Sequence, residues 1–256
     1  MTYNNIFDSH AHYDDERFDI DREEVIENLF SNGVDGIINV GCNMERSQKS
    51  VDFANKYEKF YAAVGIHPED IYDLPNDYLD KIKSWCENKK VVAIGEIGLD
   101  YHYENYDKDL QIKIFKEQLS LAKQIDMPVI IHCRDATRDC MDILNEYKQK
   151  GVMHCFSGSK EIAKEVLSLG MNISFTGVLT FKNATRAIDA LKEIPLERLL
   201  LETDCPYMAP EPHRGERCDS SLIPFVAEKI AEIKNTNAQN VIDICTQNTK
   251  KIFGID

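Results

Sequence analysis

The sequence lacks the features that mark several common protein classes. None of its apolar runs approaches the ~18 residues that a membrane-spanning helix needs, so we predict no association with a membrane. Its first ten residues hold neither a basic segment nor an apolar core, which predicts a cytoplasmic protein without a secretory signal. Its eight cysteines form no CxxC pair and are too sparse for a disulfide scaffold, which excludes a zinc ribbon and a thioredoxin-type redox motif.

Positive charge is also scarce. The 30 Lys and Arg residues against 44 Asp and Glu residues give a net charge of -14 at pH 7. Proteins that coat nucleic acid carry the opposite balance, so a phosphate ligand would have to be attracted by a few local groups. Long charge blocks and linkers rich in Gly, Ser or Pro are absent as well. We therefore predict a single domain over residues 1–256, with 43% apolar residues to fill its core.

What the chain contains is a regular alternation of strand and helix patterns. Short runs rich in Val, Ile and Phe predict eight strands, at residues 6–8, 36–40, 61–65, 91–96, 128–132, 152–154, 172–176 and 199–202. Segments of helical periodicity lie between and after them, at residues 22–30, 46–57, 78–87, 109–124, 135–147, 160–168, 184–193, 221–233 and 239–252. Three helices are predicted to end at a left-handed glycine, at Gly33, Gly151 and Gly170.

This alternation predicts the fold. Strands that alternate with helices pair in parallel through right-handed crossovers. Eight such units in 256 residues match the size and strand count of a closed TIM-type (β/α)8 barrel, an α/β fold. The alternative is an open doubly wound sheet, which would be expected to carry a glycine-rich phosphate turn after its first strand. Residues 8–12 read DSHAH at that position, which favours the barrel.

A barrel holds its active site at the carboxyl ends of its strands, and six histidine and acidic residues fall there. They are His10 and His12 after the first strand, Glu96 ending the fourth, His132 ending the fifth, His154 ending the sixth and Asp204 just past the eighth. Because residues two apart on a strand share a face, His10 and His12 can hold one cation together. Glu96 comes from the strand before the one that carries His132, so its carboxylate can bridge two ions. The pattern predicts a centre for two divalent metal ions.

Such a centre is suited to hydrolysis. Two divalent ions lower the pKa of a bound water and neutralise the oxyanion that forms on attack. Asp204 would also accept the proton of that water, so Asp204 and Glu96 are the candidate catalytic residues. Three cysteines each follow a predicted ligand, and strand alternation turns at least the first two toward the helices. We interpret Cys133, Cys155 and Cys205 as packing residues, with a thiolate ligand as the weaker alternative.

Several motifs resemble those of the TatD family of metal-dependent deoxyribonucleases, a branch of the amidohydrolase superfamily. They occur in order over nearly the whole chain: DSHAH (8–12), GIHP (65–68), GEIGLD (95–100), PVIIHCRDA (128–136), HCFSG (154–158), ETDCPYMAP (202–210) and PHRG (212–215). The resemblance implies a barrel that hydrolyses phosphodiester bonds with Mg²⁺, Mn²⁺ or Zn²⁺, as a 3′-to-5′ exonuclease on single-stranded DNA. It assigns one ion to His10, His12 and Asp204 and the other to His132 and His154, with Glu96 between them.

The resemblance also implies contacts with a nucleic-acid substrate. His67, in the GIHP motif, matches a histidine that faces the substrate phosphate, although it is equally readable as a structural residue before Pro68. A guanidinium meets a phosphate with two parallel hydrogen bonds, so arginines near the ligands are candidates for clamping it. The candidate phosphate contacts are Arg134, His213, Arg214 and Arg217. Phe156 and Tyr207 could stack on a base, with core packing as the alternative for Phe156.

The loop after the last ligand departs from the family pattern. Relatives often read PHRGKRNEP where this chain reads PHRGERCDS, so Glu216 stands in place of a lysine, Cys218 in place of an asparagine and Ser220 in place of a proline. Loss of a positive charge there should weaken contact with a polyanion in a salt-dependent way. We expect a monomer that needs no organic cofactor.

Two other functions stay open on the sequence. A two-metal centre accepts an acyl oxygen as well as a phosphoryl oxygen, so an acyl or amide hydrolase, such as a D-aminoacyl-tRNA deacylase, is the alternative enzyme. A binding protein with structural metals is the third hypothesis. It is disfavoured because closed structural zinc sites favour cysteine, whereas these ligands are His, Glu and Asp.

Overall fold

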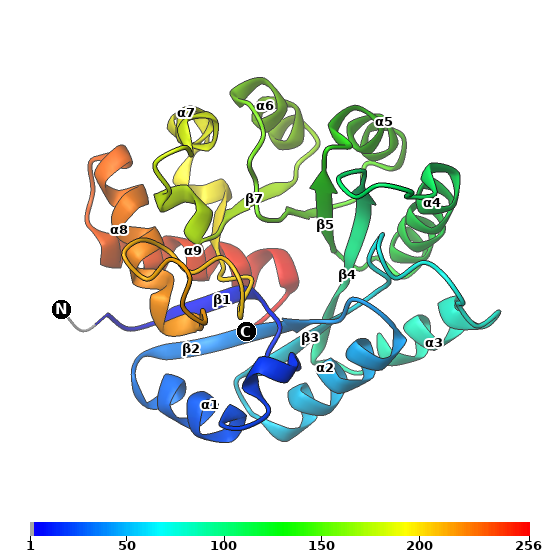
Figure 1. Ribbon diagram of the computed structural model, residues 1–256, viewed down its shortest axis with the longest axis horizontal. Coiled ribbons are helices and arrows are strands. Elements are labelled where there is room, and N and C mark those ends of the chain that lie inside the picture. Colours follow the sequence, from blue (N-terminus) through cyan, green and yellow to red (C-terminus); the bar gives the residue numbers. More distant parts are fainter. Residues whose placement is uncertain (1–2) are drawn as a thin grey trace.

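The computed structural model describes residues 3–256 and arranges them as a barrel of parallel strands surrounded by helices (Figure 1). The strands, in the order in which they lie side by side, are β1 (Ile6–Ala11), β2 (Val34–Val40), β3 (Phe60–Val64), β4 (Val91–Asp100), β5 (Val129–Arg134), β6 (Gly151–Met153), β7 (Asn172–Phe175) and β8 (Leu199–Leu201). The α-helices are α1 (Arg22–Ser31), α2 (Met44–Lys56), α3 (Tyr78–Trp85), α4 (Lys108–Gln124), α5 (Thr137–Tyr147), α6 (Lys160–Ser168), α7 (Thr185–Glu193), α8 (Ile223–Lys234) and α9 (Ala238–Phe253). Short 3₁₀ helices are η1 (Glu16–Phe18), η2 (Gly177–Thr180), η3 (Leu196–Arg198) and η4 (Ser220–Leu222). Within residues 3–256, every helix is too short or too polar to cross a bilayer.

Hydrogen bonds between the two ends of the sheet close the barrel. The backbone amide of His12 donates to the carbonyl of Cys205 at 2.9 Å, and the amide of Asp204 donates to the carbonyl of His10 at 2.9 Å. Ala11 and Cys205 also form a parallel bridge. The first strand thus pairs with the segment after the last one. The sheet is therefore closed, and the alternative of an open doubly wound sheet is excluded. The predicted single-domain barrel is confirmed.

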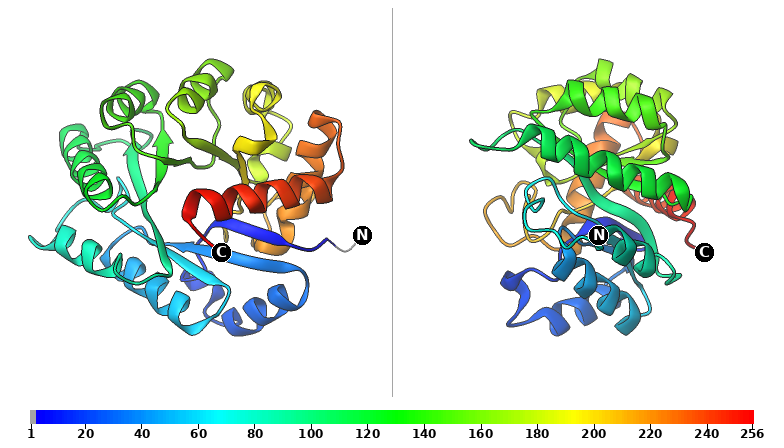
Figure 2. Two further views of the ribbon diagram at one scale, coloured as in Figure 1. Left: turned by 180° about the vertical axis from the view of Figure 1, so that it is seen from behind. Right: turned by 90° about the vertical axis from the view of Figure 1, so that its right-hand side faces the viewer.

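Two groups of buried apolar side chains stabilise this arrangement, because successive residues of a strand point to opposite faces. Ile37 of β2 belongs to the larger group, which fills the space between the strands and the outer helices. Its neighbour Ile38 belongs to the smaller group, which includes Phe7 of β1 and fills the inside of the barrel. Phe253 at the end of α9 joins this inner group. Figure 2 shows α9 lying across the back of the barrel, where it covers that side of the inner core.

Three strands run further than the sequence pattern predicts, and the extensions bear on the site. The sequence pattern predicts that Glu96 ends the fourth strand. β4 instead continues to Asp100, so Glu96 lies within the strand. β5 continues to Arg134, and β1 continues through His10 to Ala11. The extra residues of β4 and β5 pair with each other, as Asp100 does with Arg134. The sheet edge that carries the site is therefore rigid for several residues beyond the predicted strand ends.

The predicted glycine stops are confirmed at two positions and wrong at the third. Gly33 and Gly170 follow α1 and α6 with φ of 99° and 82°. Gly151 instead opens β6, and Lys148 provides the left-handed residue after α5. A side chain at Gly151 would place its Cβ 2.1 Å from the carbonyl oxygen of Val129, so this glycine permits the close approach of β5 and β6.

Candidate metal centre

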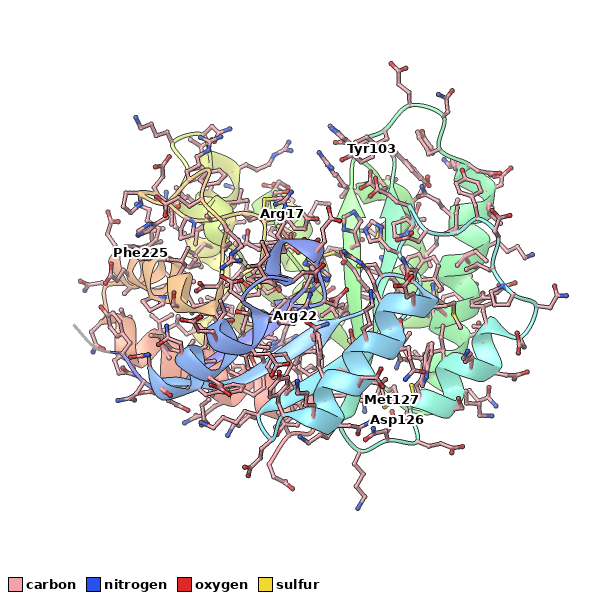
Figure 3. All side chains as sticks on the ribbon, turned by 60° about the horizontal axis from the view of Figure 1, so that its bottom comes forward. Arg17, Arg22, Tyr103, Asp126, Met127 and Phe225 are labelled. Atoms are coloured by element: carbon pink, nitrogen blue, oxygen red, sulfur yellow. The ribbon has the colours of Figure 1, made fainter. Side chains whose placement is uncertain are left out.

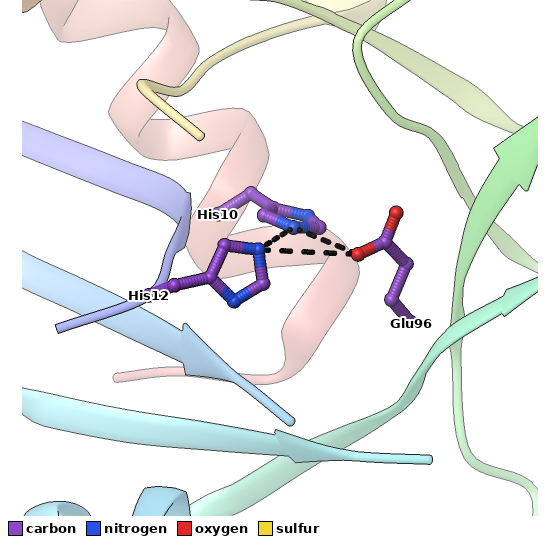
Figure 4. Close-up of side chains that lie close together, drawn as sticks. All are labelled: His10, His12 and Glu96. Carbon is purple, nitrogen blue, oxygen red and sulfur yellow. Dashed lines mark hydrogen bonds and ion pairs between the residues drawn. The ribbon is translucent and has the colours of Figure 1, made fainter. Parts of the chain in front are cut away.

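The first half of the centre is built on β1 and β4 (Figure 4). His10 and His12 project to the same side, and their Nε2 atoms lie 3.1 Å apart. The Oε2 atom of Glu96 lies 3.4 Å from the Nε2 atom of His10 and 3.9 Å from that of His12. All three side chains are buried, with residue exposures of 0%, 4% and 4%. His10 lies on β1 and His12 directly follows its last residue, so one short segment brings the two rings together.

Asp204 completes this half from the turn after β8. Its Oδ1 atom lies 3.3 Å from the Nε2 atom of His12 and 3.7 Å from that of His10. The residue adopts a left-handed conformation with φ of 59°, which aspartate tolerates better than most residues. The backbone bond from Asp204 to His10 that closes the barrel also holds this carboxylate beside the two histidines.

The second half of the centre lies on the other side of the Glu96 carboxylate. The Oε1 atom of Glu96 is 2.8 Å from the Nδ1 atom of His132 and 2.7 Å from the Nε2 atom of His154. These two nitrogens are 3.5 Å apart. Each oxygen of Glu96 therefore faces a different pair of histidines, which is the arrangement that a carboxylate needs to bridge two ions.

The centre contains three sets of three side chains. Within each set, one donor atom from every side chain lies within 4.8 Å of the other two, a spacing suited to a metal ion. They are His10, His12 and Glu96; His10, His154 and Asp204; and His67, Glu96 and His132. The donors are imidazole nitrogens and carboxylate oxygens, a set that suits exchangeable catalytic ions better than closed structural zinc. Two buried nitrogens in the cluster, Nδ1 of His10 and Nδ1 of His154, have no hydrogen-bond partner among the described residues.

Contacts on the far side of three rings, two of them hydrogen bonds, set which nitrogen faces the centre. The Nδ1 atom of His12 donates to the carbonyl oxygen of Val40 at 2.8 Å. The Nε2 atom of His132 donates to Oδ2 of Asp100 at 2.9 Å, and the Nδ1 atom of His154 lies 3.4 Å from Oε1 of Glu202. Carboxylates or carbonyls behind an imidazole fix its tautomer and raise its basicity as a ligand.

The electrostatics of the cluster match its composition. Burial acts to raise the pKa of Glu96, but His154, His67 and His10 around it hold that pKa well below its ordinary value. Burial acts to lower the pKa of His132, and hydrogen bonds to Asp100 and Glu96 outweigh it and raise the pKa to about 9. Without a bound cation, protons on the histidines balance the buried carboxylates. A metal ion entering the centre must displace those protons.

His67 lies closer to the centre than its predicted role requires. It follows β3, and its Nε2 atom lies 3.7 Å from Oε1 of Glu96. Its ring centroid is 4.4 Å from that of His132. Its Nδ1 atom accepts a hydrogen bond from the backbone amide of Glu69, so its Nε2–H points inward. Burial, followed by the charge of His132, lowers the pKa of His67 to about 3, so the ring is neutral.

The predicted phosphate contacts differ in their surroundings. Arg134, at the end of β5, donates to the hydroxyl of Tyr103 at 3.3 Å. Arg217 instead directs both terminal nitrogens to the carboxylate of Asp21, at 2.7 and 2.6 Å, so its guanidinium is already engaged within the chain. That ion pair argues against a phosphate clamp at Arg217.

The other two candidates lie in the loop after β8. The guanidinium of Arg214 lies over the ring of Phe181, 4.3 Å from its centroid. The Nδ1 atom of His213 lies 2.9 Å from Oε2 of Glu216. Glu216, the residue that stands in place of a lysine, therefore occupies the ring nitrogen of His213 and places a carboxylate beside this candidate phosphate contact. Tyr207 is 39% exposed in this loop, whereas Phe156 is buried against Phe175.

The cysteines beside the ligands make contacts away from the centre. The Cys133 thiol is hydrogen-bonded to Cys140 of α5, an interaction that lowers the pKa of Cys133. The Sγ atom of Cys155 lies 3.5 Å from Oγ1 of Thr176, and Cys205 is fully buried. A fourth thiol also lies near the centre. Cys42 follows β2, and its Sγ atom lies 3.9 Å from Nδ1 of His12. The sequence analysis did not identify it, because no pattern in the sequence connects Cys42 to His12.

Comparison with known proteins agrees with this geometry. The family described as TatD related DNase matches residues 7–254. The chain belongs to the TatD family. The uncharacterised metal-dependent hydrolase YabD of Bacillus subtilis is 43% identical to it over 254 residues, which cover 98% of this chain and 100% of that protein. The 3′-5′ ssDNA/RNA exonuclease TatD of Citrobacter rodentium is 31% identical over 259 residues and 98% of this chain.

A solved structure extends the likeness to the fold. The TatD homologue YjjV of Escherichia coli superimposes with a TM-score of 0.92 at 30% identity, covering 98% of this chain and 99% of the other. This TatD-family protein is thus a metal-dependent hydrolase whose buried clusters of His, Glu and Asp are suited to metal binding.

Proposed function

We propose that this hydrolase cleaves phosphodiester bonds in single-stranded nucleic acid, as a 3′-to-5′ exonuclease on single-stranded DNA. The observation that carries the proposal is the Glu96 carboxylate, which faces one histidine pair with each of its oxygens while Asp204 lies beside the first pair. The names of relatives in Citrobacter rodentium and Pantoea ananatis, 3′-5′ ssDNA/RNA exonuclease TatD, support the choice of substrate.

The residues present fit two divalent ions. His10, His12 and Asp204 would hold one, His132 and His154 would hold the other, and Glu96 would contact both. Mn²⁺, Zn²⁺ or Mg²⁺ bound there would supply Lewis acidity, both to acidify a water and to stabilise charge on the phosphoryl oxygens. The chain itself contributes the rigid placement of these donors, which comes from paired strands and from the hydrogen bonds behind the histidine rings.

Asp204 is the residue that we assign to proton transfer. Burial acts to raise its pKa, but its hydrogen bond with His12 and the charge of His10 hold it below the ordinary value, so the side chain is a carboxylate at neutral pH. A carboxylate in that position accepts the proton of a water attacking the substrate. Glu96, which lies between the histidine pairs, keeps its charge and orients them.

The overall charge agrees with a short substrate segment. A net charge of -14 repels a long duplex, whereas a strand end contacts only the mouth of the barrel. Arg134 provides a positive charge there, because it forms no ion pair with a carboxylate of residues 3–256, unlike Arg46 and Arg217.

A gel assay tests the proposal. A 5′-labelled single-stranded oligonucleotide should shorten step by step in the presence of Mn²⁺ or Mg²⁺, and the same oligonucleotide in a duplex should be cut more slowly. Chelator should abolish the reaction. A deacylation assay on D-aminoacyl-tRNA is run in parallel. Turnover of the acyl substrate alone would overturn the phosphodiesterase assignment and favour the acyl hydrolase.

Asp204→Asn is the matched change at the site. Asparagine fits the left-handed conformation at this position, so the fold should persist while turnover falls by a factor of about 10² to 10⁴, the usual contribution of a general base. Asp126→Asn is the control, because Asp126 has the same kind of left-handed backbone, with φ of 55°, and lies at the opposite end of the barrel. Full turnover by Asp204→Asn with metal bound would exclude Asp204 as the base.

A further inference from the structure

A tyrosine from the loop between β4 and α4 is exposed at the mouth of the barrel. Tyr103 is 54% exposed, and among the Phe, Trp and Tyr residues of 3–256 only Tyr72, Tyr106 and Tyr207 are exposed as well. Figure 3 shows Tyr103 at the end of the barrel toward which the arrows of β4 and β5 point, and Asp126 and Met127 at the opposite end. The ring therefore lies on the same side as the metal centre, three residues after Asp100, the hydrogen-bond acceptor of His132.

Arg134 lies over this ring. The carbon at the centre of its guanidinium is 5.3 Å from the ring centroid of Tyr103, and its Nη1 atom donates to the tyrosine hydroxyl at 3.3 Å. Arg134 follows His132 by two residues on β5 and is exposed. Because no carboxylate of residues 3–256 pairs with it, its charge is available to an anion. The arginine covers part of the ring, and the His102 ring packs against it at 82° with centroids 5.2 Å apart, yet 54% of Tyr103 stays exposed and can contact a planar group.

The surrounding backbone is held in place. The amide of Tyr101 donates to the carbonyl oxygen of Arg134 at 3.0 Å, and the amide of His102 donates to Oδ1 of Asp100 at 2.9 Å. The His102 ring reaches across to the next loop, where its Nδ1 atom lies 2.8 Å from Oδ2 of Asp135. An exposed ring on an anchored loop loses little conformational freedom when it binds a ligand.

We propose that Tyr103 and Arg134 form a nucleotide subsite beside the metal centre, an inference that rests on the proposed function. A nucleobase stacks on the exposed surface of the Tyr103 ring, and a backbone phosphate next to it pairs with the Arg134 guanidinium. Stacking of this kind accepts any base but requires it to be unpaired. The subsite thus makes the enzyme select single strands, in a chain whose net charge otherwise repels nucleic acid.

Two oligonucleotides of equal length and charge test the base contact. One is an ordinary single-stranded DNA 12-mer, and the other has abasic sugars at its last two 3′ positions. For the ordinary substrate, Tyr103→Ala should lower kcat/KM about tenfold, as loss of one stacked base implies. For the abasic substrate it should have no effect. Tyr103→Phe keeps the ring and should stay within about twofold of the parent protein on both.

Arg134→Gln should lower kcat/KM about equally on the two substrates, because both carry the phosphate. The inference is overturned if Tyr103→Ala acts equally on the ordinary and abasic substrates, or on neither. Binding of fluorescein-labelled versions of both oligonucleotides, followed by anisotropy, gives the same comparison without turnover. If the parent protein cleaves neither substrate, the proposed exonuclease fails, and the anisotropy comparison still decides whether Tyr103 binds a base. Equal affinity of the parent for both oligonucleotides would reject the subsite.

Discussion

At the scale of single residues, the candidate metal centre is defined by the groups behind its histidines as well as by the histidines themselves. Three of the four histidines have an oxygen facing their second ring nitrogen, from Val40, Asp100 or Glu202. These contacts leave the inward nitrogen of each ring to the centre. Asp100 is the clearest case, because it is almost fully buried and accepts from His132 at 2.9 Å.

Asp100→Asn should weaken metal binding without unfolding the protein. The amide fills the same space but carries no charge to hold His132, so we expect the affinity for Mn²⁺ or Zn²⁺ to fall about 10- to 100-fold. Calorimetric titration of the metal-free protein measures this directly. The matched control is Asp135→Asn, whose carboxylate faces the exposed His102 and not a ligand. Equal affinities in parent and Asp100→Asn would show that Asp100 has no role in holding His132.

The position of the candidate ligands at one rim could be predicted and the residues that support them could not, for a physical reason. His10, His12 and Asp204 follow strands whose apolar pattern is clear, so their place at the rim follows from the fold class. Asp100 lies four residues after Glu96, beyond the point where that pattern predicts the strand to end. Only the structure shows β4 continuing to Asp100, which places both carboxylates on one rigid strand.

At the scale of the secondary-structure elements, one buried carboxylate joins the two ends of the sheet. Asp8 of β1 accepts from the backbone amide and the hydroxyl of Thr203, at 3.0 and 2.6 Å, and from the hydroxyl of Ser220 at 2.7 Å. It therefore connects the first strand to the turn after β8 and to η4. Asp8 precedes His10 by two residues and Thr203 directly precedes Asp204, so closure of the barrel and alignment of these two candidate ligands depend on the same group.

Asp8→Ala should destabilise the fold strongly. Four buried donors, the amides of His10 and Thr203 and the hydroxyls of Thr203 and Ser220, would lose their acceptor. We therefore expect the free energy of unfolding to fall by about 2–4 kcal/mol, measured by urea denaturation. Ser220→Ala removes only one of the four bonds to Asp8 and should cost about 1 kcal/mol. If Asp8→Ala unfolded at the same urea concentration as the parent protein, the barrel would not depend on this connection.

Long-range loop contacts mark the limit of prediction at this scale. Alternating apolar runs predict the eight strands and their order, since each run is a local property of the sequence. Arg217 was a candidate for binding phosphate because it lies near the ligands in the sequence, yet it pairs with Asp21, 196 residues away. Such partners depend on how two loops pack at the rim, and nothing local to either loop specifies them.

At the scale of the whole molecule, folding, proton binding and metal binding are coupled. In the absence of a metal ion, hydrogen bonds to Asp100 and Glu96 overcome burial and raise the pKa of His132 from 6.5 to about 9. A pKa raised in the folded state stabilises the fold fully below the unfolded value of 6.5, and this contribution is lost as the pH rises through 9. The metal-free barrel should therefore lose stability between those limits, as buried carboxylates become uncompensated.

A bound cation supplies the charge that those protons provide, so metal ions should stabilise the protein more at higher pH. We expect Mn²⁺ at about 100 times its Kd to add about 2.7 kcal/mol, a rise in Tm of about 5–10 °C. At one fixed Mn²⁺ concentration the rise should be larger at pH 8 than at pH 6, because fewer protons compete for the histidines and the Kd is lower. Differential scanning calorimetry at the two pH values, with and without chelator, measures both effects.

Glu96→Gln should abolish the metal-induced rise, whereas Asp126→Asn, far from the centre, should preserve it. A rise in Tm that is the same at both pH values would mean that the cation and the protons occupy different groups.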